Sequence, residues 1–288
     1  MLSRLRSAPA ALAAWFRTRP ARGARILMFH GTPRRDAGLL ERQLAWLRRR
    51  FRIVRLEEVL DLGPDCGPCV ALTFDDGLRS NVQVAYPILR KLGLPATFFV
   101  CPGLIDRAAW LWNHEARQRL RHAGEAAEVV EWMKTLPSRL RHEVEARLRQ
   151  VTPGFSPSRS QRAEFDLATW DELRALDPRI VSIGSHTLTH PILPLSTPQE
   201  VEAEVAESRA RIEAELQRRV DAFAYPNGDY DETVRDCVRR HYRIAVAVEE
   251  QPVTLPCDPY LLPRVAAPKG ALRLARKMGS DRSDPISL

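Results

Sequence analysis

The sequence predicts an α/β fold that is built on a parallel sheet and carries polar groups at the ends of its strands. Short apolar segments rich in β-branched residues alternate with segments whose apolar residues recur at helical spacing. Several apolar segments run directly into histidine, aspartate or glycine. The 288 residues, of which 44% are hydrophobic, are enough for two average domains or for one α/β barrel, which commonly has about 250 residues.

The first predicted strand, residues 25–31, ends in His30 and Gly31. A histidine after an apolar run is often a core residue with a satisfied hydrogen bond. We favour a functional role for His30, because parallel barrels gather their chemistry at the carboxyl ends of strands. An amphipathic helix over residues 39–51 follows, and then a short strand and a helical turn over residues 54–60.

The next strand, residues 70–74, runs without a spacer into Asp75, Asp76 and Gly77. Neighbouring strand residues point to opposite sides, so the two aspartates can share a task only if the backbone turns there, and Gly77 permits such a turn. Two like charges this close repel each other. A metal or another bound cation is therefore the natural way to keep both carboxylates ionised.

A pair of histidines follows a later strand, residues 180–185. His186 and His190 are four residues apart, but Pro191 disfavours a helical conformation for His190, so we place the pair on a loop. One aspartate and two histidines form a set that holds a divalent metal on one face. Such a set leaves positions open for water and substrate.

The other elements complete the alternating pattern. A helix over residues 80–92 and a strand over residues 95–100 form a βαβ unit with the Asp75 strand, so the sheet is parallel there. Residues 104–167 are rich in charge and predict a helical insertion, in which Trp110 and Trp112 either line a binding cleft or form the insertion's own core. Further elements are predicted as helices from residues 169 and 197, a strand at 222–228, a helix at 231–242, a strand at 243–248 and a last core segment at 261–265.

The composition narrows the partners and the compartment. The net charge of +8 suits anionic partners, but we interpret it as arginine spread over solvated helix faces and predict no nucleic-acid partner. Five scattered cysteines indicate a reducing compartment rather than a disulfide framework. The run Cys66-Gly67-Pro68-Cys69 matches a thioredoxin-type redox motif, but it precedes a strand instead of following one, so we expect no redox centre.

The two ends of the chain are predicted to lie outside the barrel domain, which spans residues 24–270. Residues 1–23 form a basic segment whose apolar patch is too short for a secretion signal. We therefore expect a cytoplasmic protein, with an alternative of peripheral contact between this segment and the inner membrane face. No segment approaches the roughly 20 apolar residues of a transmembrane helix. Residues 271–288 are predicted to be a tail.

At these motifs the sequence resembles the polysaccharide deacetylase family, which is NodB-like and also known as carbohydrate esterase family 4. Residues 73–77, Thr-Phe-Asp-Asp-Gly, and residues 186–190, His-Thr-Leu-Thr-His, match that family's first two motifs. The resemblance covers roughly residues 25–264, interrupted by the insertion. It implies a distorted (β/α) barrel of about seven parallel strands and N-acetylated sugars as the substrate class.

The resemblance also implies roles for the motif residues. Asp76, His186 and His190 would bind a divalent ion, most simply Zn²⁺ with Co²⁺, Mn²⁺ or Fe²⁺ as alternatives, and Asp75 would be the general base. Such an ion polarises a carbonyl and lowers the pKa of a bound water toward about 7, and Asp75 beside it can take the water's proton. The expected function is removal of N-acetyl groups from a cell-envelope glycan or glycolipid precursor. Trp110 and Trp112, if they line the cleft, would stack on the faces of its sugars.

The third family motif carries an arginine, a proline and a glycine near the base. Tyr225, Pro226 and Asn227 lie in the matching segment, where alanine replaces the arginine, so we predict that Arg264 takes over the orienting role. The family's C-terminal Leu-x-x-His acid has no counterpart here. Poly-N-acetylglucosamine deacetylase-like members have an equivalent histidine near the N-terminus, so His30 is predicted to be the general acid for the leaving amine.

Two other functions fit parts of these patterns. The same metal site supports a C–N hydrolase that acts on a small non-sugar amide. A non-catalytic carbohydrate-binding relative is the other alternative, but a binding module has no need to keep two repelling carboxylates. An open groove lined by the insertion's tryptophans would favour a glycan, and a closed pocket would favour a small amide.

Overall fold

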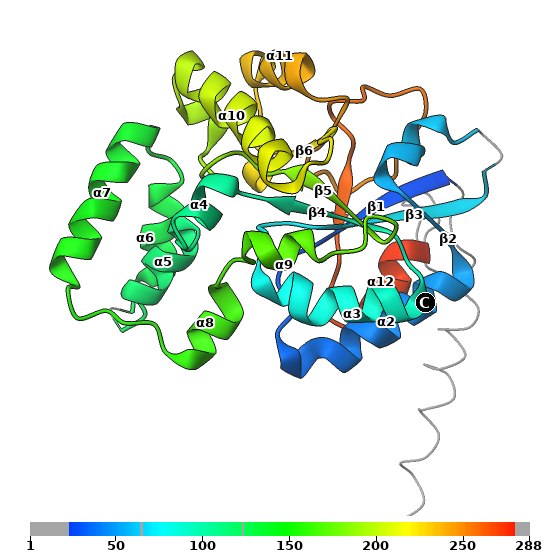
Figure 1. Cartoon of the computed structure of the whole chain (residues 1–288), viewed down its shortest axis with the longest axis horizontal. Helices are drawn as coiled ribbons and strands as arrows, with labels where there is room; N and C mark the ends of the chain where they lie inside the picture. The colour runs from blue at the N-terminus through cyan, green and yellow to red at the C-terminus, as the bar shows by residue number, and fades with distance from the viewer. Residues whose placement is uncertain (1–22, 64–65, 123, 280–288) are drawn as a thin grey trace, which may run out of the picture.

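The computed structural model of the protein describes residues 23–63, 66–122 and 124–279 (Figure 1). Its core is one sheet in which all named strands pair in parallel, in the order β7-β6-β5-β4-β3-β1-β8, with β2 beside the first half of β3. The strands are β1 (Gly23–Phe29), β2 (Arg52–Val54), β3 (Pro68–Phe74), β4 (Ala96–Val100), β5 (Val181–Ser185), β6 (Ala222–Ala224), β7 (Ile244–Val246) and β8 (Arg264–Ala266).

The edges of this sheet meet, so the sheet is nearly closed into a barrel. Val246 of β7 forms a parallel bridge with Leu262, which lies just before β8. Leu262 accepts a backbone hydrogen bond from Ala247 at 2.9 Å and donates one to Ala245 at 3.0 Å. The predicted distorted (β/α) barrel of about seven parallel strands is confirmed.

Helices cover the outside of the barrel because alternate strand residues face two separate cores. Leu27 and Phe98 pack with the helices, whereas Ile26 and Phe99 belong to a cluster in which strand side chains contact one another across the interior. The outer helices are α2 (Ala37–Arg50), α3 (Tyr86–Leu92), α9 (Trp170–Arg174), α10 (Pro198–Leu216), α11 (Glu232–His241) and α12 (Ala271–Gly279). Short helical turns are η1 (Arg34–Asp36), η2 (Leu56–Asp61), η3 (Asn81–Ala85), η4 (Leu193–Leu195) and η5 (Pro226–Gly228).

Local sequence signals determine where α10 begins. Thr197 accepts a hydrogen bond from the backbone N–H of Glu200, and the Glu200 carboxylate accepts one from the backbone N–H of Thr197. This reciprocal cap satisfies two N–H groups of the first turn, and Pro198 needs no partner at the first helical position. Val201 and Val205 then lie one turn apart on the buried face.

The prediction of a tail over residues 271–288 is wrong for residues 271–279. They form α12, which packs against α2 and buries Leu274, Ala275 and Met278. The spacing of these three side chains provides an apolar helix face, which the basic residues between them concealed in the sequence. Residues 1–22 and 280–288 lie outside the described residues. They include almost all of the basic N-terminal segment for which contact with a membrane is predicted.

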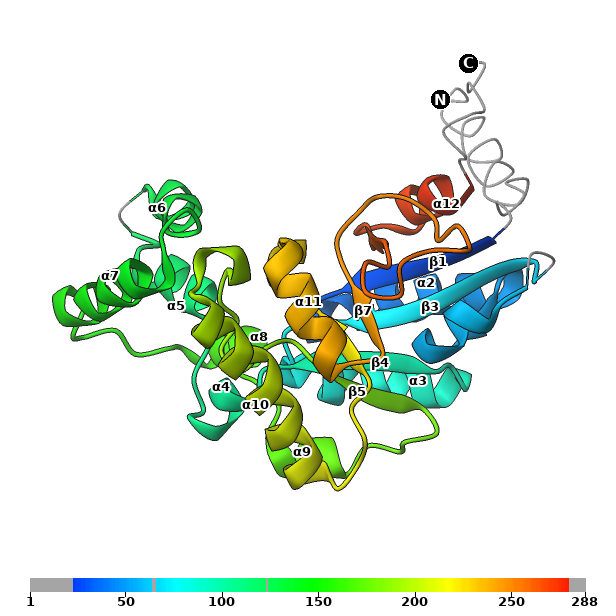
Figure 2. The same ribbon diagram turned by 90° about the horizontal axis from the view of Figure 1, so that it is seen from above.

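A helical insertion leaves the barrel between β4 and β5 and projects to one side (Figures 1 and 2). Its helices are α4 (Pro102–Asp106), α5 (Trp112–Arg119), α6 (Ala126–Met133), α7 (Ser138–Val151) and α8 (Arg159–Phe165). Trp112, Val130 and Met133 form a small core with Ile192, which follows the histidine loop of the barrel. Among the described residues, no helix is long and apolar enough to cross a membrane.

Candidate metal centre and active site

The backbone turns at the two aspartates, as the sequence predicts. The N–H of Asp75 donates to the carbonyl of Phe29 at 2.9 Å, and Asp76 and Gly77 then adopt φ angles of 72° and 65°. A Cβ atom at residue 77 would lie 3.1 Å from Val100, so the position needs glycine for its space as well as its conformation. The turn leaves both carboxylates buried, with 2% of Asp75 and 4% of Asp76 exposed.

The ring of His186 is oriented by the neighbouring strand. Its Nδ1 lies 2.7 Å from the carbonyl oxygen of Ala224 in β6. A carbonyl only accepts, so Nδ1 carries the proton and Nε2 is left with a free lone pair. Thr187 and His190 adopt φ angles of 67° and 62°, and the Thr187 hydroxyl accepts a hydrogen bond from the His190 N–H at 2.9 Å. This tight loop turns the second imidazole back toward the first.

Two contacts from other elements hold the histidine loop. Glu204 of α10 accepts hydrogen bonds from the N–H of Thr189 at 2.8 Å and from its hydroxyl. Trp112 of the insertion donates its Nε1–H to the carbonyl of His190 at 3.0 Å. The Trp112 ring is 4% exposed and lies 5.0 Å from the Arg141 guanidinium carbon. Trp112 is therefore part of the insertion's core and not an open stacking surface for a sugar.

Asp76, His186 and His190 meet at one point. Asp76 Oδ1 lies 3.8 Å from His186 Nε2 and 3.7 Å from His190 Nε2. These distances are too long for hydrogen bonds, and they are a few tenths of an ångström above the roughly 3.4 Å between two ligands of a tetrahedral zinc ion. Burial lowers the pKa of His186 and lowers that of His190 to about 3, so both imidazoles are neutral. Two neutral imidazoles and one carboxylate fit a divalent ion.

Asp75 is not one of the ligand groups that meet at this point, and it pairs instead with Arg264, the residue predicted to orient it. Arg264 is fully buried, and its Nη1 lies 2.6 Å from Asp75 Oδ1. Burial by itself raises the pKa of Asp75, but the charge and hydrogen bond of Arg264 lead the interactions that outweigh this, and the pKa falls to about 2. Arg264 also donates from Nε to the carbonyl of Ala247 at 3.2 Å, which fixes the plane of the guanidinium.

His30 lies at the end of β1 and is exposed, so its ring has access to solvent. Its charge is the largest influence that lowers the pKa of Asp76 against the effect of burial. Sequence reasoning missed His114 of α5, which interacts electrostatically with Asp76 and His190. His114 is half-buried, and its buried Nδ1 atom has no hydrogen-bond partner among the described residues. Its place at the end of the Trp110–His114 aromatic cluster was the only signal in the sequence.

The remaining predicted residues lie around the site with different surroundings. Tyr225 is buried and donates its hydroxyl to the carbonyl of Tyr260 at 3.0 Å, while Pro226 is buried and Asn227 is exposed with a φ of 55°. Tyr225 thus supports the end of β6. Trp110 is 9% exposed and donates its Nε1–H to Asp166 at 2.8 Å, so its ring, too, packs mainly within the insertion.

The second cysteine of the Cys66–Cys69 motif is buried in the sheet. Cys69 lies in β3 and is 1% exposed, and burial together with Cys66 raises its pKa to about 11. All five cysteines are free. A reactive cysteine has a lowered pKa, so Cys69 is not an activated thiol.

Three comparisons place the chain among known proteins. The family model described as "Polysaccharide deacetylase" matches residues 63–243. YxkH of Bacillus subtilis (strain 168) is 24% identical over 271 residues, which cover 89% of this chain and 76% of YxkH.

Solved structures of deacetylases share the fold. The Streptococcus pyogenes deacetylase PplD in complex with acetate has a TM-score of 0.64 and 20% identity, and the match covers 91% of this chain and 100% of PplD. IcaB from Ammonifex degensii has a TM-score of 0.61 and 18% identity, and the match covers 91% of this chain and 99% of IcaB.

Proposed function

This chain belongs to the polysaccharide deacetylase family, and from this membership we propose that it removes N-acetyl groups from a glycan or glycolipid precursor in a reaction that depends on a divalent metal ion. As a member of this family the protein is a hydrolase that acts on carbon–nitrogen bonds. The proposal adds the metal, the chemical roles of single residues and the kind of glycan.

One observation carries the proposal: a metal-ligand set and a separate, ionised carboxylate lie side by side. Asp76, His186 and His190 turn three ligand atoms toward one point, within 4.8 Å of one another. Asp75 is adjacent in the chain but is held by Arg264 instead of by the histidines. A site that only bound sugar would gain nothing from burying a second carboxylate next to the first, because the two charges repel.

The proposed reaction gives each of these side chains a step. Asp76, His186 and His190 would hold a divalent ion, which would polarise the acetamido carbonyl and lower the pKa of a water molecule toward about 7. Asp75 accepts a proton from the water as its oxygen attacks the carbonyl carbon, and Arg264 keeps Asp75 ionised and aligned before the attack. When the carbon–nitrogen bond breaks, His30 donates a proton to the leaving amine, and acetate is released. His30 can be reprotonated afterwards because it is exposed to solvent.

Zinc is the ion that we propose first. Neutral imidazoles and a carboxylate are common zinc ligands, and three protein ligands leave the position that a catalytic site needs. Co²⁺, Mn²⁺ and Fe²⁺ accept the same donor atoms. Metal analysis of the purified protein, followed by reconstitution with each ion, distinguishes between them.

An assay for free amine released from N-acetylated oligosaccharides tests the proposal. We expect release by the metal-loaded protein, loss of release with a chelator, and recovery on addition of zinc or cobalt. Asp75→Asn should lower the rate by a factor of about 10² or more, the typical contribution of general acid–base catalysis, while the metal content stays unchanged. Asp236→Asn, a substitution of a more exposed aspartate on α11, is the matched control and should keep full activity.

Three results would contradict the proposal. Full activity in the presence of the chelator would exclude the metal from the reaction. Full activity of Asp75→Asn would exclude Asp75 as the base. Hydrolysis of small amides without release from any oligosaccharide would point to a C–N hydrolase with a non-sugar substrate.

A further inference from the structure

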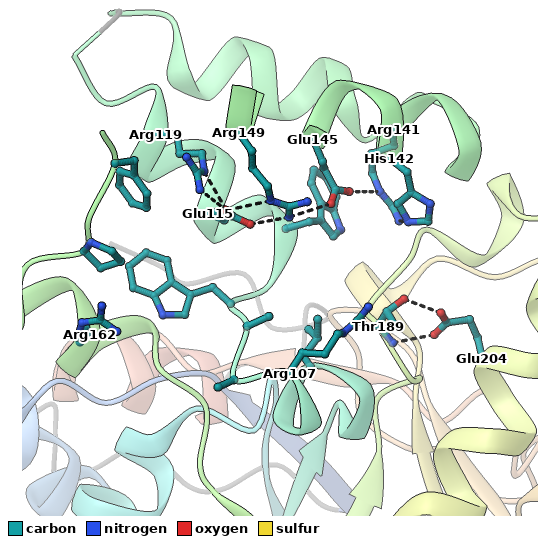
Figure 3. A pocket seen from close by; sticks show the side chains of 17 residues that line it. Arg107, Glu115, Arg119, Arg141, His142, Glu145, Arg149, Arg162, Thr189 and Glu204 are labelled. Atoms are coloured by element: carbon teal, nitrogen blue, oxygen red, sulfur yellow. Dashed lines mark hydrogen bonds and ion pairs between the residues drawn. The ribbon is translucent and has the colours of Figure 1, made fainter. Parts of the chain in front are cut away.

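A cavity of about 710 Å³ lies between the insertion and the histidine loop (Figure 3). Its volume is within the roughly 300–1,000 Å³ of small-molecule sites. Thr189, which directly precedes the metal ligand His190, forms part of its wall, as does Trp112. The aspartates and histidines of the metal centre do not line it. The cavity therefore adjoins the reaction centre without being part of it.

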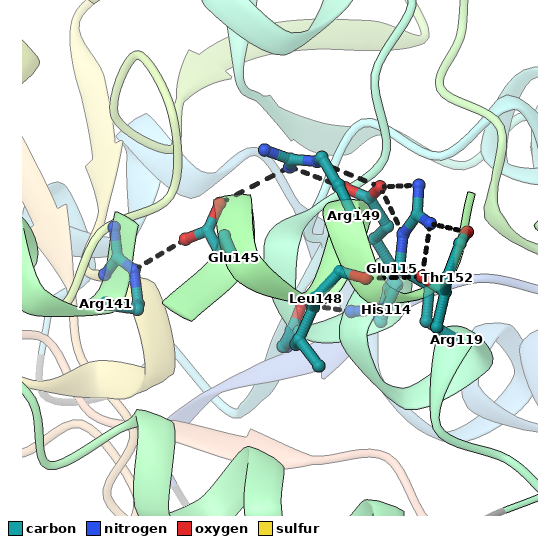
Figure 4. A network of polar contacts seen from close by, with 9 residues as sticks. His114, Glu115, Arg119, Arg141, Glu145, Leu148, Arg149 and Thr152 are labelled. Carbon is teal, nitrogen blue, oxygen red and sulfur yellow. Dashed lines mark hydrogen bonds and ion pairs between the residues drawn. The ribbon is translucent and has the colours of Figure 1, made fainter. Parts of the chain in front are cut away.

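The insertion side of this cavity carries more positive than negative charge. Glu115 lies 2.8 Å from Arg119 and 2.7 Å from Arg149, and Glu145 lies 3.1 Å from Arg141 and 3.5 Å from Arg149 (Figure 4). Two carboxylates thus form ion pairs with three guanidinium groups in one connected network. One positive charge on this wall is left without its own counter-ion.

Two other arginines of the insertion add further positive charge across the cavity. Arg107, which follows α4, and Arg162 of α8 line the cavity (Figure 3), and among the described residues neither has a carboxylate at ion-pair distance. Glu204 is the third glutamate that lines the cavity. Its carboxylate already accepts hydrogen bonds from Thr189, and burial raises its pKa. Five arginines therefore face three glutamates around this cavity.

A buried arginine shows that this excess is more than ordinary surface charge. Arg141 is 1% exposed, and its Nη1 atom has no hydrogen-bond partner among the described residues. Its guanidinium carbon lies 5.0 Å from the Trp112 ring, and its Nη2 lies 3.2 Å from His142 Nε2. Among the described residues Glu145 is its single carboxylate partner. Burying a guanidinium with so little compensation is costly, and an anion in the adjoining cavity would supply the missing negative charge.

We propose that this cavity binds an anionic group, a phosphate or a carboxylate, on the glycan that the metal centre deacetylates. The proposal rests on the proposed function and narrows its substrate to an acidic or phosphorylated N-acetylated glycan. Guanidinium groups bind both anions through paired N–H···O contacts, which neutral sugars do not offer. Because Thr189 joins the cavity wall to a metal ligand, the bound anion would set which acetamido group reaches the metal.

Binding to the Asp75→Asn variant tests this without turnover. Calorimetry would compare a neutral N-acetylglucosamine oligosaccharide with the same oligosaccharide carrying a terminal phosphate, and with one carrying a terminal uronate. We expect at least one anionic form to bind about tenfold more tightly than the neutral form, and we expect added salt to reduce the difference. The phosphate and uronate arms identify which anion the natural substrate carries.

Substitutions locate the effect. Arg107→Gln and Arg162→Gln change exposed cavity residues, so both variants should fold, and each should lower the preference for the anionic oligosaccharide several-fold. Arg147→Gln is the matched control: it removes an exposed arginine of α7 that does not line the cavity, and the preference should stay intact.

Equal affinity for neutral and anionic oligosaccharides in the Asp75→Asn protein would overturn the proposal. The proposal would also be overturned if the preference for the anionic oligosaccharide survived both cavity substitutions, or if Arg147→Gln abolished it equally. Either result would show that the preference comes from general surface charge. These outcomes are independent of the proposed function, since a protein that fails to release amine can still show or lack the binding preference.

Discussion

The pair formed by Asp75 and Arg264 is the most informative place to perturb this protein. Arg264→Ala removes a fully buried guanidinium that contacts Asp75 at 2.6 Å, the carbonyl of Ala247 at 3.2 Å and the Phe99 ring at 5.6 Å. The substitution leaves Asp75 buried without a counter-ion. We therefore expect it to lower both the stability of the fold and the reactivity of the site.

The size of the effect follows from the pKa of Asp75. The native environment, with burial opposing and Arg264 and His186 favouring ionisation, lowers this pKa from 3.8 to about 2. At 1.36 kcal/mol per pKa unit, the difference corresponds to about 2 kcal/mol in favour of the carboxylate. Loss of Arg264 forfeits most of this and leaves the burial penalty unopposed, so we expect a cost of about 3–5 kcal/mol, typical of breaking a buried ion pair.

Urea unfolding of the metal-free protein, followed by circular dichroism, measures this cost, and a double-mutant cycle with Asp75→Asn isolates the pair. The Asp75→Asn/Arg264→Ala variant removes both charges, so its cost should be at least about 1 kcal/mol below the sum of the single costs. Because the native pKa of Asp75 is lowered, the stability that it contributes is present above pH 4 and is lost as the pH falls toward 2. Additive single costs, or a loss below about 1 kcal/mol for Arg264→Ala, would refute the reasoning.

Three further substitutions test other parts of the structure. Gly184→Ala would place a Cβ atom 2.4 Å from the Phe99 ring, so we expect unfolding free energy to fall by about 1–3 kcal/mol in urea titrations, and a neutral result would contradict the packing. Trp112→Phe removes the hydrogen bond to the histidine loop, so under the proposed metal binding zinc affinity should fall about tenfold or more in competition with a chelator. His114→Ala should lower kcat/KM about tenfold or more with unchanged metal content, whereas the exposed His122→Ala should have no effect.

Short stretches of sequence identified the fold and most of the candidate site. The strand before Asp75 and the loop before Pro191 are recognisable locally, because burial, backbone turns and proline restrictions act on neighbouring residues. The insertion was also visible as a charge-rich helical segment. The sequence did not reveal that Trp112 anchors that insertion to the histidine loop, since an indole in a core and an indole in a cleft have the same local pattern.

The residues that complete the site depend on contacts between distant parts of the chain. Arg264 lies 189 positions from Asp75, and its role as partner became definite only when barrel closure brought β8 beside β1 and the β3 carboxylate into reach. His114 and the arginine-lined cavity belong to helices whose positions are set by packing against the barrel. Local patterns in the sequence thus determined which side chains stand at the strand ends. Which of those side chains pair, and which charges stay uncompensated, was decided by burial and distance in the folded chain.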